Sequence, residues 1–528
     1  MATTSKAKTY MSWLTICFMM VAAVASIRSL PSMAVYGLGS VFLYVIPALL
    51  FFIPVSLVAS ELGTGWNGGI YGWVRQAYGD RPGFFIMWFM WVQVVTWYPI
   101  VLGFGASTLA YLINPELAKS GVFTTAVIIV LYWLSTFVAL NGLTALSKLT
   151  SWFMLLGTAL PAALLVLLGV AWLVLGHKSA TPLTWDALIP AIFDTHTTAQ
   201  AGAHKLHQDF WQQFTGAITG LVLIVSNFLA FAGIEMNAIH ARELRNPQKE
   251  MPRAILLAFF MILLVFIPPT VAISLVVPAD STSLTAGVIQ AYSAFFEGFG
   301  IPWATPILAV LLIIGALGGV LAWTAGPSTG LLFVGKAGML PPIFQQVNKK
   351  GVQKNILYLQ AIIVTLLSTI YIFIDNVSDA FWMISAMAAL MYLIIYVFMF
   401  LAAMKLRKTQ PNVKRGYVLK GLHGWCYLGL FSTCVALIFG FIPPSSFSSM
   451  PFLEYAGILL LGLIIAGIPP FVFYAVRKPS WQMVPKAEAD QYSAALQDLQ
   501  DQDDKAAAAA AASTRATSAT PPTAPAAT

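Results

Sequence analysis

The sequence predicts an all-α, polytopic membrane protein with twelve transmembrane helices. Of its 528 residues, 59% are hydrophobic and only 9% are charged, and the mean hydropathy is +0.80, which is far from the composition of a soluble globular chain. Apolar stretches of about 20 residues, the length that crosses the hydrocarbon core of a bilayer, recur along most of the chain. Lys and Arg gather in alternate loops, as they do in chains that cross a membrane many times.

The predicted spans divide the chain into an N-terminal segment at 1–10, a membrane domain at 11–478 and a tail at 479–528. The spans are expected at 11–36, 39–60, 83–113, 121–140, 151–176, 213–239, 254–278, 303–334, 355–374, 380–404, 424–443 and 452–475. The tail holds an acidic run, an alanine run and an end rich in Thr, Pro and Ala. Because this composition offers too little varied apolar surface for a core, the tail is predicted to be a disordered, low-complexity segment.

The placement of positive charge predicts which side each loop faces. If the N-terminus is cytoplasmic, 24 of the 28 Lys and Arg lie in the termini and the inner loops, and the outer loops hold only Lys119, Lys178 and Lys205. The remaining one, Arg28, lies inside the first span. By the positive-inside rule, both termini are expected in the cytoplasm. The same asymmetry accounts for the net charge of +8, so no nucleic-acid partner is expected.

Cysteines and histidines give no sign of a disulfide framework, a metal centre or a cofactor. The three cysteines, Cys17, Cys426 and Cys434, all fall in predicted spans. Three of the six histidines, His196, His204 and His207, lie in the long outer loop between spans five and six and lack a familiar ligand spacing. That loop is expected to be solvated.

The most informative residues are two ionisable groups at membrane depth, Arg28 in the first span and Glu235 in the sixth. A charge at that depth is costly unless it lines a cavity or meets a partner, so each residue marks a candidate functional site. Both spans also carry helix-breaking signals, because Pro31 lacks an amide proton and Gly233 stands two residues before Glu235. Irregular backbone in a membrane is tolerated only where protein or a water-filled cavity satisfies it.

Interruptions in the first and sixth spans are the pattern of two inverted repeats of five helices, each beginning with a broken helix. Spans eleven and twelve would then lie outside the repeats. The substrate site of such transporters lies near the midplane of the membrane, between the repeats. The repeat is inferred from position alone, because spans one to five and six to ten show no direct sequence similarity.

Three stretches carry a family pattern. They read ELGTGWNGGIYGWV at 61–74, FAGIEMNAIHARELRNPQKEMPRA at 231–254 and AWTAGPSTGLLFVGKAGMLPPIFQQVNKKG at 322–351. In this order and spacing they resemble the amino acid–polyamine–organocation superfamily of transporters. Through GPSTG, NKKG and the pair Tyr392 and Tyr396, the chain looks most like the bacterial glutamate/γ-aminobutyrate antiporter branch. The resemblance covers roughly residues 10–478.

The resemblance and the two breaks imply a binding site for a free amino acid between helices 1, 6, 8 and 10. The candidate substrate-binding residues are Ala25, Ser26, Ile27, Arg28, Ala230, Phe231, Gly233, Trp323, Tyr392 and Tyr396. Amides of the first break are expected to bind the substrate carboxylate, and carbonyls of the second break are expected to accept from the ammonium. The alternative for the small residues is close helix packing, and for the aromatic residues it is ordinary core packing.

Glu235 matches the acidic residue that follows the small Gly motif in the sixth helix of the family. The resemblance implies a role in gating, in proton coupling or in orienting the network beside the substrate. The alternative is a structural carboxylate bonded to amides of the broken helix.

Arg28 departs from the antiporter branch, which carries Tyr at about this position. The branch also carries an acidic residue four positions before the tryptophan of span eight, where this chain has Gly319. Both differences make the expected cavity more positive. Arg28 then has three candidate roles: it binds a substrate carboxylate bidentately, it pairs with Glu235, or it extends to the outer surface as an anchor.

The expected function is secondary active amino acid transport by alternating access, by exchange, with glutamate or a related amino acid as substrate. Proton-coupled symport and a nutrient receptor without turnover remain alternatives. An enzyme with Glu235 as general base would need a nucleophile or metal ligands at similar depth, and none is found there. The expected location is a bacterial inner membrane, with a lipid bilayer and a small-molecule amino acid as partners, and the protein is expected to be a monomer or a homodimer.

Overall fold

The computed structural model describes residues 11–142, 150, 152–153, 155–188, 221–444 and 450–483. Three expectations lie outside these residues: the N-terminal segment 1–10, the outer loop with His196, His204 and His207, and the tail from residue 484 onward.

The helices fall where the apolar stretches predict them. Ten helices of the described part are long and apolar enough to cross a membrane. They are Gly37–Gly65, Asp80–Ile113, Gly121–Leu140, Leu155–Val174, Pro247–Val276, Pro302–Lys336, Lys354–Phe373, Val377–Thr409, Leu422–Gly440 and Phe452–Val476. Two shorter apolar helices, Trp13–Val24 and Val222–Ala238, occupy the first and sixth positions. The all-α polytopic fold is confirmed, and the inverted repeat stays a prediction.

Several spans are built from more than one regular element. The α-helices, in chain order, are α1 (Trp13–Val24), α2 (Leu30–Ala34), α3 (Ser40–Pro47), α4 (Ile53–Gly65), α5 (Gly69–Tyr78), α6 (Asp80–Ile113), α7 (Gly121–Leu140), α9 (Leu160–Val174), α11 (Val225–Ala230), α12 (Pro247–Val276), α13 (Gly287–Gly298), α14 (Thr305–Lys336), α15 (Lys354–Ser368), α16 (Ile370–Phe373), α17 (Val377–Thr409), α18 (Leu422–Gly440) and α19 (Phe452–Val476). One π-helical turn, Ala48–Phe52, joins α3 to α4, and another, Leu155–Ala159, precedes α9.

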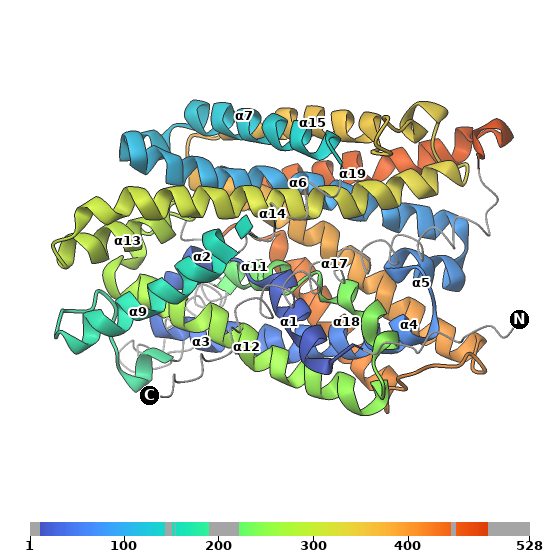
Figure 1. Ribbon diagram of the computed structural model, residues 1–528, viewed down its shortest axis with the longest axis horizontal. Coiled ribbons are helices and arrows are strands. Elements are labelled where there is room, and N and C mark those ends of the chain that lie inside the picture. The colour runs from blue at the N-terminus through green and yellow to red at the C-terminus, as the bar shows by residue number, and fades with distance from the viewer. Residues whose placement is uncertain are drawn as a thin grey trace, which may run out of the picture.

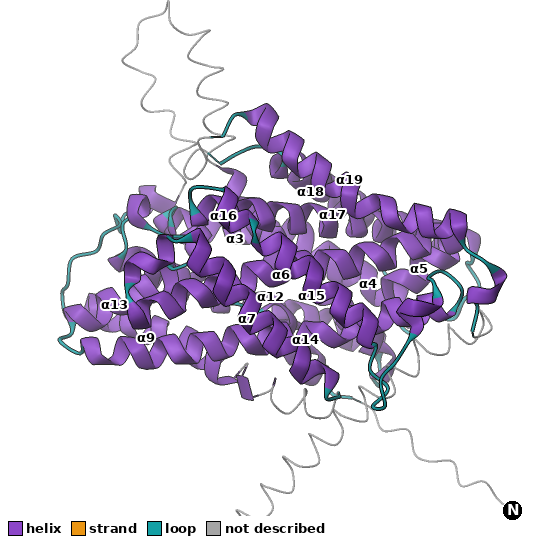
Figure 2. Cartoon of the chain, turned by 90° about the horizontal axis from the view of Figure 1, so that it is seen from above, coloured by secondary structure: helices purple, strands orange, loops and turns teal. Residues whose placement is uncertain are grey.

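The long helices run roughly along one axis of an elongated bundle (Figures 1 and 2). Helix α6 packs against α14, α7 and α17, so it is central. The most apolar windows of α6 and α17 are each 78% buried, whereas that of α19 is only 17% buried. Helix α19 therefore lies at the edge, where its apolar side chains are free to contact lipid.

The first span is interrupted between α1 and α2. Helix α1 begins at Ser12, whose hydroxyl accepts from the amide of Leu14, and it ends at Val24. Ala25–Ser29 are not helical, and Pro31 takes an early position of α2, where its missing amide proton costs no hydrogen bond.

The sixth span is interrupted after α11. Gly233 adopts the left-handed conformation, with φ +100°, which a residue with a side chain rarely adopts. The chain then continues as a 3₁₀ helix, η9 (Ile234–Glu243). A Cβ at Gly233 would lie 3.1 Å from the Trp323 ring, so space and backbone conformation both favour glycine there.

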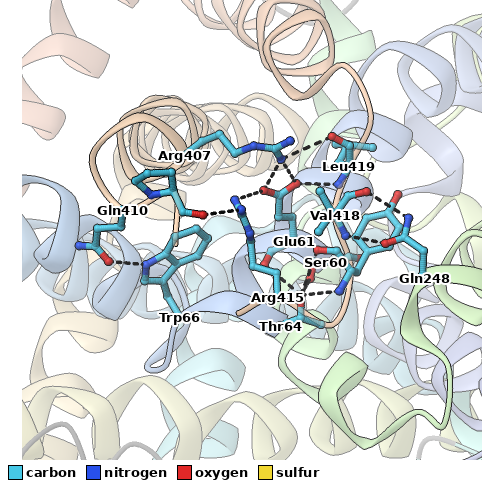
Figure 3. Close-up of polar contacts among 12 residues, drawn as sticks. Ser60, Glu61, Thr64, Trp66, Gln248, Arg407, Gln410, Arg415, Val418 and Leu419 are labelled. Carbon is cyan, nitrogen blue, oxygen red and sulfur yellow. Dashed lines mark hydrogen bonds and ion pairs between the residues drawn. The ribbon is translucent and has the colours of Figure 1, made fainter. Parts of the chain in front are cut away.

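Ion pairs surround Glu61, near the end of α4, at one end of the bundle (Figure 3). Arg407 donates to both carboxylate oxygens, at 2.5 and 2.6 Å, and Arg415 donates to one of them at 3.2 Å. The amide of Leu419 donates to the other oxygen at 2.7 Å. Glu61 is 1% exposed, so these four donor contacts replace its hydration. We call this end of the bundle, with the loop 410–421, the basic end.

The same end is tied to the sixth span and to the loop after α17. Arg242, in η9, donates to the carbonyl of Gly63 at 2.6 Å, and the Trp66 indole donates to Gln410 at 2.7 Å (Figure 3 shows the latter). Burial and, to a smaller extent, the charge of Glu61 raise the pKa of Tyr417 to about 12, so its hydroxyl stays protonated.

Replacing Glu61 with Gln is expected to destabilise the protein. Arg407 and Arg415 would lose their shared anion while remaining only 27% and 11% exposed. Because both arginines keep some access to water, the expected loss is about 1–3 kcal/mol. Thermal unfolding of the purified protein in detergent measures it.

The matched control is Glu116→Gln. Glu116 pairs with Lys119, but the two side chains are 71% and 76% exposed, so the change should stay within about 0.5 kcal/mol. Equal melting temperatures for the two variants would contradict the structural role of Glu61.

Candidate functional site

A cavity of about 600 Å³ lies where the two interrupted spans meet α6 and α14. This volume is within the range of small-molecule sites. Its wall along α14 runs from Leu312 to Pro327, which is roughly 20 Å at the rise of an α-helix. Residues of α1 line it from Met19 onward, whereas no residue of α2 does. The cavity therefore extends from the breaks along α1, toward the basic end.

Most of the predicted substrate-binding residues line this cavity. They are Ala25, Ser26, Ile27, Arg28, Ala230, Gly233, Trp323 and Tyr392. Residues from spans one, six, eight and ten, which lie far apart in the sequence, thus share one wall. Phe231, Tyr396 and Glu235 are not among the lining residues.

Three consecutive backbone amides at the first break have no partner among the described residues. The amides of Ser26, Ile27 and Arg28 make no hydrogen bond there, while Ala25 still donates to Val21 at 2.8 Å. Consecutive free amides form a cradle for an anion. The carbonyls of Phe231 and Ala232 likewise accept no hydrogen bond from the described chain. Donors from one break and acceptors from the other suit the two ends of a zwitterion.

Glu235 is held directly behind the second break. It is 2% exposed, and it accepts from Tyr392 at 2.9 Å, from Tyr396 at 2.5 Å and from the amide of Gly233 at 3.1 Å. The Gly233 amide also approaches the Tyr396 hydroxyl, at 2.9 Å. The carboxylate thus satisfies an amide that the break leaves without a helical partner. This geometry matches the structural alternative for Glu235, in which it bonds to the broken helix.

The side chains of Phe231 and Tyr396, both expected to bind substrate, lie behind the cavity and not in its wall. The Phe231 ring is fully buried, 5.8 Å from the Phe266 ring and 6.2 Å from the Phe52 ring, so it packs in the core behind the cavity. Tyr396 lies one helical turn beyond Tyr392, and their rings stack at 5.1 Å. Only Tyr392 reaches the cavity wall, and Tyr396 supports it through Glu235.

The two interrupted spans are bonded to each other on both sides of the breaks. Ser32 of α2 and Ser226 of α11 share a hydrogen bond of 3.0 Å. Nearer the basic end, the Asn237 side chain donates to the carbonyl of Met19 at 3.3 Å. The halves of the two spans on each side are therefore fixed to one another, and the cavity lies between them.

Arg28 lines the cavity and is only 8% exposed. Its guanidinium carbon lies 5.2 Å from the centre of the Trp97 ring. Among the described residues it has no ion pair, so it does not pair with Glu235, which is bonded elsewhere. Its burial also argues against an anchor at the outer surface.

Sequence reasoning missed several lining residues. Gln93 and Trp97 come from α6, and Met236 and Asn237 come from the start of η9. The other α6 residues in the lining are Val94, Val101 and Phe104. Nothing in the apolar run of α6 marks Trp97 as facing the cavity, because the hydrophobicity of that helix is nearly the same on all sides. Gln93 and Asn237, in contrast, are polar residues within predicted spans and could have been found by their depth.

The site has no arrangement typical of a hydrolase or a metalloenzyme. No group of three or more His, Cys, Asp or Glu able to hold a metal ion occurs in the described ranges. What the cavity offers is a buried chamber with unpaired backbone groups, two aromatic walls and one guanidinium. Such a lining suits a small polar molecule.

Comparison with known proteins agrees with this geometry. A family described as amino acid permease matches residues 11–464. An uncharacterised transporter of Legionella pneumophila is 37% identical over 86% of this chain and 94% of its own length. A glutamate/γ-aminobutyrate antiporter of Lactococcus lactis is 28% identical, over 85% and 87% of the two chains. A probable agmatine/putrescine antiporter of the same species is 22% identical, over 81% and 86%.

The family match covers both interrupted spans, the cavity and nearly all of the membrane domain. The chain belongs to the amino acid permease family, within the amino acid–polyamine–organocation superfamily.

Proposed function

We propose that this protein is a secondary active transporter that exchanges amino acids by alternating access. The observation that carries the proposal is the cavity of about 600 Å³ between the two helix breaks, in a chain of the amino acid permease family. A free amino acid has to lose water from two charged groups when it enters a membrane-buried site. Unpaired backbone amides and carbonyls compensate that loss without introducing a fixed charge.

The proposed pose follows from the two breaks. The substrate carboxylate binds at the amides of Ser26, Ile27 and Arg28, which the described chain leaves free. The ammonium binds at the carbonyls of Phe231 and Ala232, which accept no hydrogen bond from the described chain. Trp323 and Tyr392 cover the substrate from the side of spans eight and ten.

Exchange is favoured over proton-coupled symport by the relatives. Several of them are named as antiporters, with glutamate and γ-aminobutyrate, agmatine and putrescine, or cadaverine and lysine as their pairs. Glutamate or a related amino acid is the proposed substrate, because the glutamate/γ-aminobutyrate antiporter matches over most of both chains. Symport and a receptor without turnover are the alternatives that the experiment below separates.

The proposed location is the inner membrane of a bacterium, with the basic end and both termini in the cytoplasm. The cavity runs from the breaks along α1, which supports a state open toward that side. At the opposite side, α13 packs on α2, and a Cβ at Gly287 would lie only 2.7 Å from Pro31. Alternating access would then separate α2 from α13 while α1 closes.

Glu235 has a proposed gating role in this cycle. Its carboxylate is hydrogen-bonded both to Tyr392 and Tyr396 of α17 and to the Gly233 amide at the second break. A shift of α17 would therefore displace the backbone that binds the substrate. Any rearrangement of α17 against η9 has to break these bonds or carry them along.

Counterflow in proteoliposomes tests the exchange directly. We expect a labelled amino acid to accumulate only in vesicles preloaded with an unlabelled amino acid, and an imposed proton gradient alone should give no accumulation. Accumulation driven by the proton gradient in empty vesicles would indicate symport instead. Binding of amino acids without any uptake would indicate a receptor.

Replacing Gly233 with Ala is expected to reduce exchange about tenfold or more. The left-handed backbone costs about 1–2 kcal/mol for a residue with a Cβ, and that Cβ would press on the Trp323 ring at 3.1 Å. The initial rate of counterflow, normalised to the amount of folded protein, measures the effect.

Gly424→Ala is the matched control. Gly424 lies in α18, and a Cβ there would meet nothing within 4 Å, so exchange should keep its rate. A similar loss of rate in both variants would show that the break at Gly233 has no special part in transport.

A further inference from the structure

The unusual feature of the cavity is its charge. Arg28 is the only lining residue, among those described, that carries a formal charge. The aromatic and small residues around it supply no anion. Glu235 lies outside the lining, and its oxygens are already bonded to two tyrosines and a backbone amide.

The guanidinium of Arg28 is also unpaired. Its Nε makes no hydrogen bond to any described residue, although the side chain is only 8% exposed. The face of the Trp97 ring lies 5.2 Å from the guanidinium carbon, and a cation–π contact replaces only part of the lost hydration. A buried guanidinium without an acceptor loses hydration free energy that nothing replaces. One that meets a carboxylate gains charge-assisted hydrogen bonds.

The space beside Arg28 is open on the side of α14. Gly319 lines the cavity there, and a Cβ on it would touch Trp97 at an ordinary 3.7 Å. Gly319 therefore contributes neither bulk nor negative charge to this part of the wall, and the Trp323 ring of the same helix lies 6.2 Å from the Trp97 ring. A ligand group that extends from the helix breaks toward α6 can reach the guanidinium.

From this geometry we infer that Arg28 selects substrates with a second, ionised carboxylate. The inference rests on the proposed function, and it deepens it by assigning the net charge of the substrate. The α-carboxylate and ammonium occupy the two breaks, and the side-chain carboxylate pairs with Arg28 beside Trp97. The substrate bound in the cavity is therefore an anionic, dicarboxylic amino acid. Cationic amino acids and amines are repelled by the same residue.

Glutamate and glutamine test this inference, because they have nearly the same shape and differ in the side-chain charge. In wild-type proteoliposomes preloaded with glutamate, we expect counterflow of labelled glutamate at micromolar concentration to exceed that of glutamine about tenfold to a hundredfold. Arg28→Gln should bring the ratio of the two rates near unity. Arg28→Lys, which keeps the charge without the bidentate fork, should fall between them.

A binding measurement covers the case in which a variant transports its substrate slowly or folds poorly. Glutamate should raise the melting temperature of the purified wild-type protein more than glutamine does at equal concentration. Lys119→Gln, which removes an exposed positive charge far from the cavity, should leave both the melting shift and the rate ratio unchanged.

The failures can be told apart. Robust counterflow with equal rates for glutamate and glutamine would overturn the role of Arg28 and leave the proposed exchange intact. Absence of counterflow for every amino acid, with folded protein, would overturn the proposed exchange; equal melting shifts with glutamate and glutamine would then overturn the role of Arg28 as well. A preference for glutamate that persists in Arg28→Gln would place the selecting group elsewhere.

Gly319→Asp provides an independent test that leaves Arg28 in place. The new carboxylate would lie in the cavity wall beside the Trp97 ring that Arg28 also faces, and it is expected to compete there with the substrate's second carboxylate. We expect the ratio of glutamate to glutamine counterflow to fall about tenfold or more. An unchanged ratio would contradict the proposed position of the second carboxylate.

Discussion

The bonds around Glu235 are the constraint on which the site depends. Breaking a helix inside a membrane leaves amides and carbonyls that lipid cannot satisfy. Here one carboxylate accepts from the freed amide of Gly233 and from two tyrosines on α17. The break is thereby stable in the absence of substrate, and the remaining backbone groups stay free to bind one. A buried charge that looks costly in isolation is what keeps the cavity open.

The same requirement explains the basic end of the bundle. Glu61 is as buried as Glu235, yet its partners are arginines rather than tyrosines. The arginines around Glu61 keep partial access to water, so the desolvation penalty of the ion pairs is smaller there than for fully buried pairs. At the midplane, neutral hydroxyl donors hold the carboxylate instead. The two acids are thus satisfied differently: partly hydrated arginines and a backbone amide surround Glu61, and neutral hydroxyls and a backbone amide surround Glu235.

Arg28 stands apart from both arrangements, because it is buried and has no anion in the described part of the chain. In the first two cases the protein itself supplies the partners of the buried carboxylate, which are arginines at Glu61 and neutral donors at Glu235. At Arg28 the proposed substrate supplies the anionic partner of the guanidinium. This is the physical basis for assigning an anionic substrate to the cavity. Relatives are named for amines such as putrescine and cadaverine, which are cationic. The permease scaffold by itself therefore does not fix the sign of the substrate's net charge.

The sequence by itself determined the twelve apolar segments, the two interruptions and the family, because hydrophobic length, glycine, proline and local motifs are all readable in one dimension. It also marked Arg28, Glu235, Trp323 and Tyr392 by their depth or their motif. Only the tertiary structure decided that Phe231 and Tyr396 lie behind the cavity and that Gln93 and Trp97 line it. Which side of a helix faces a cavity depends on how neighbouring helices rotate and pack, and a helix that is apolar on every side carries no signal of that rotation.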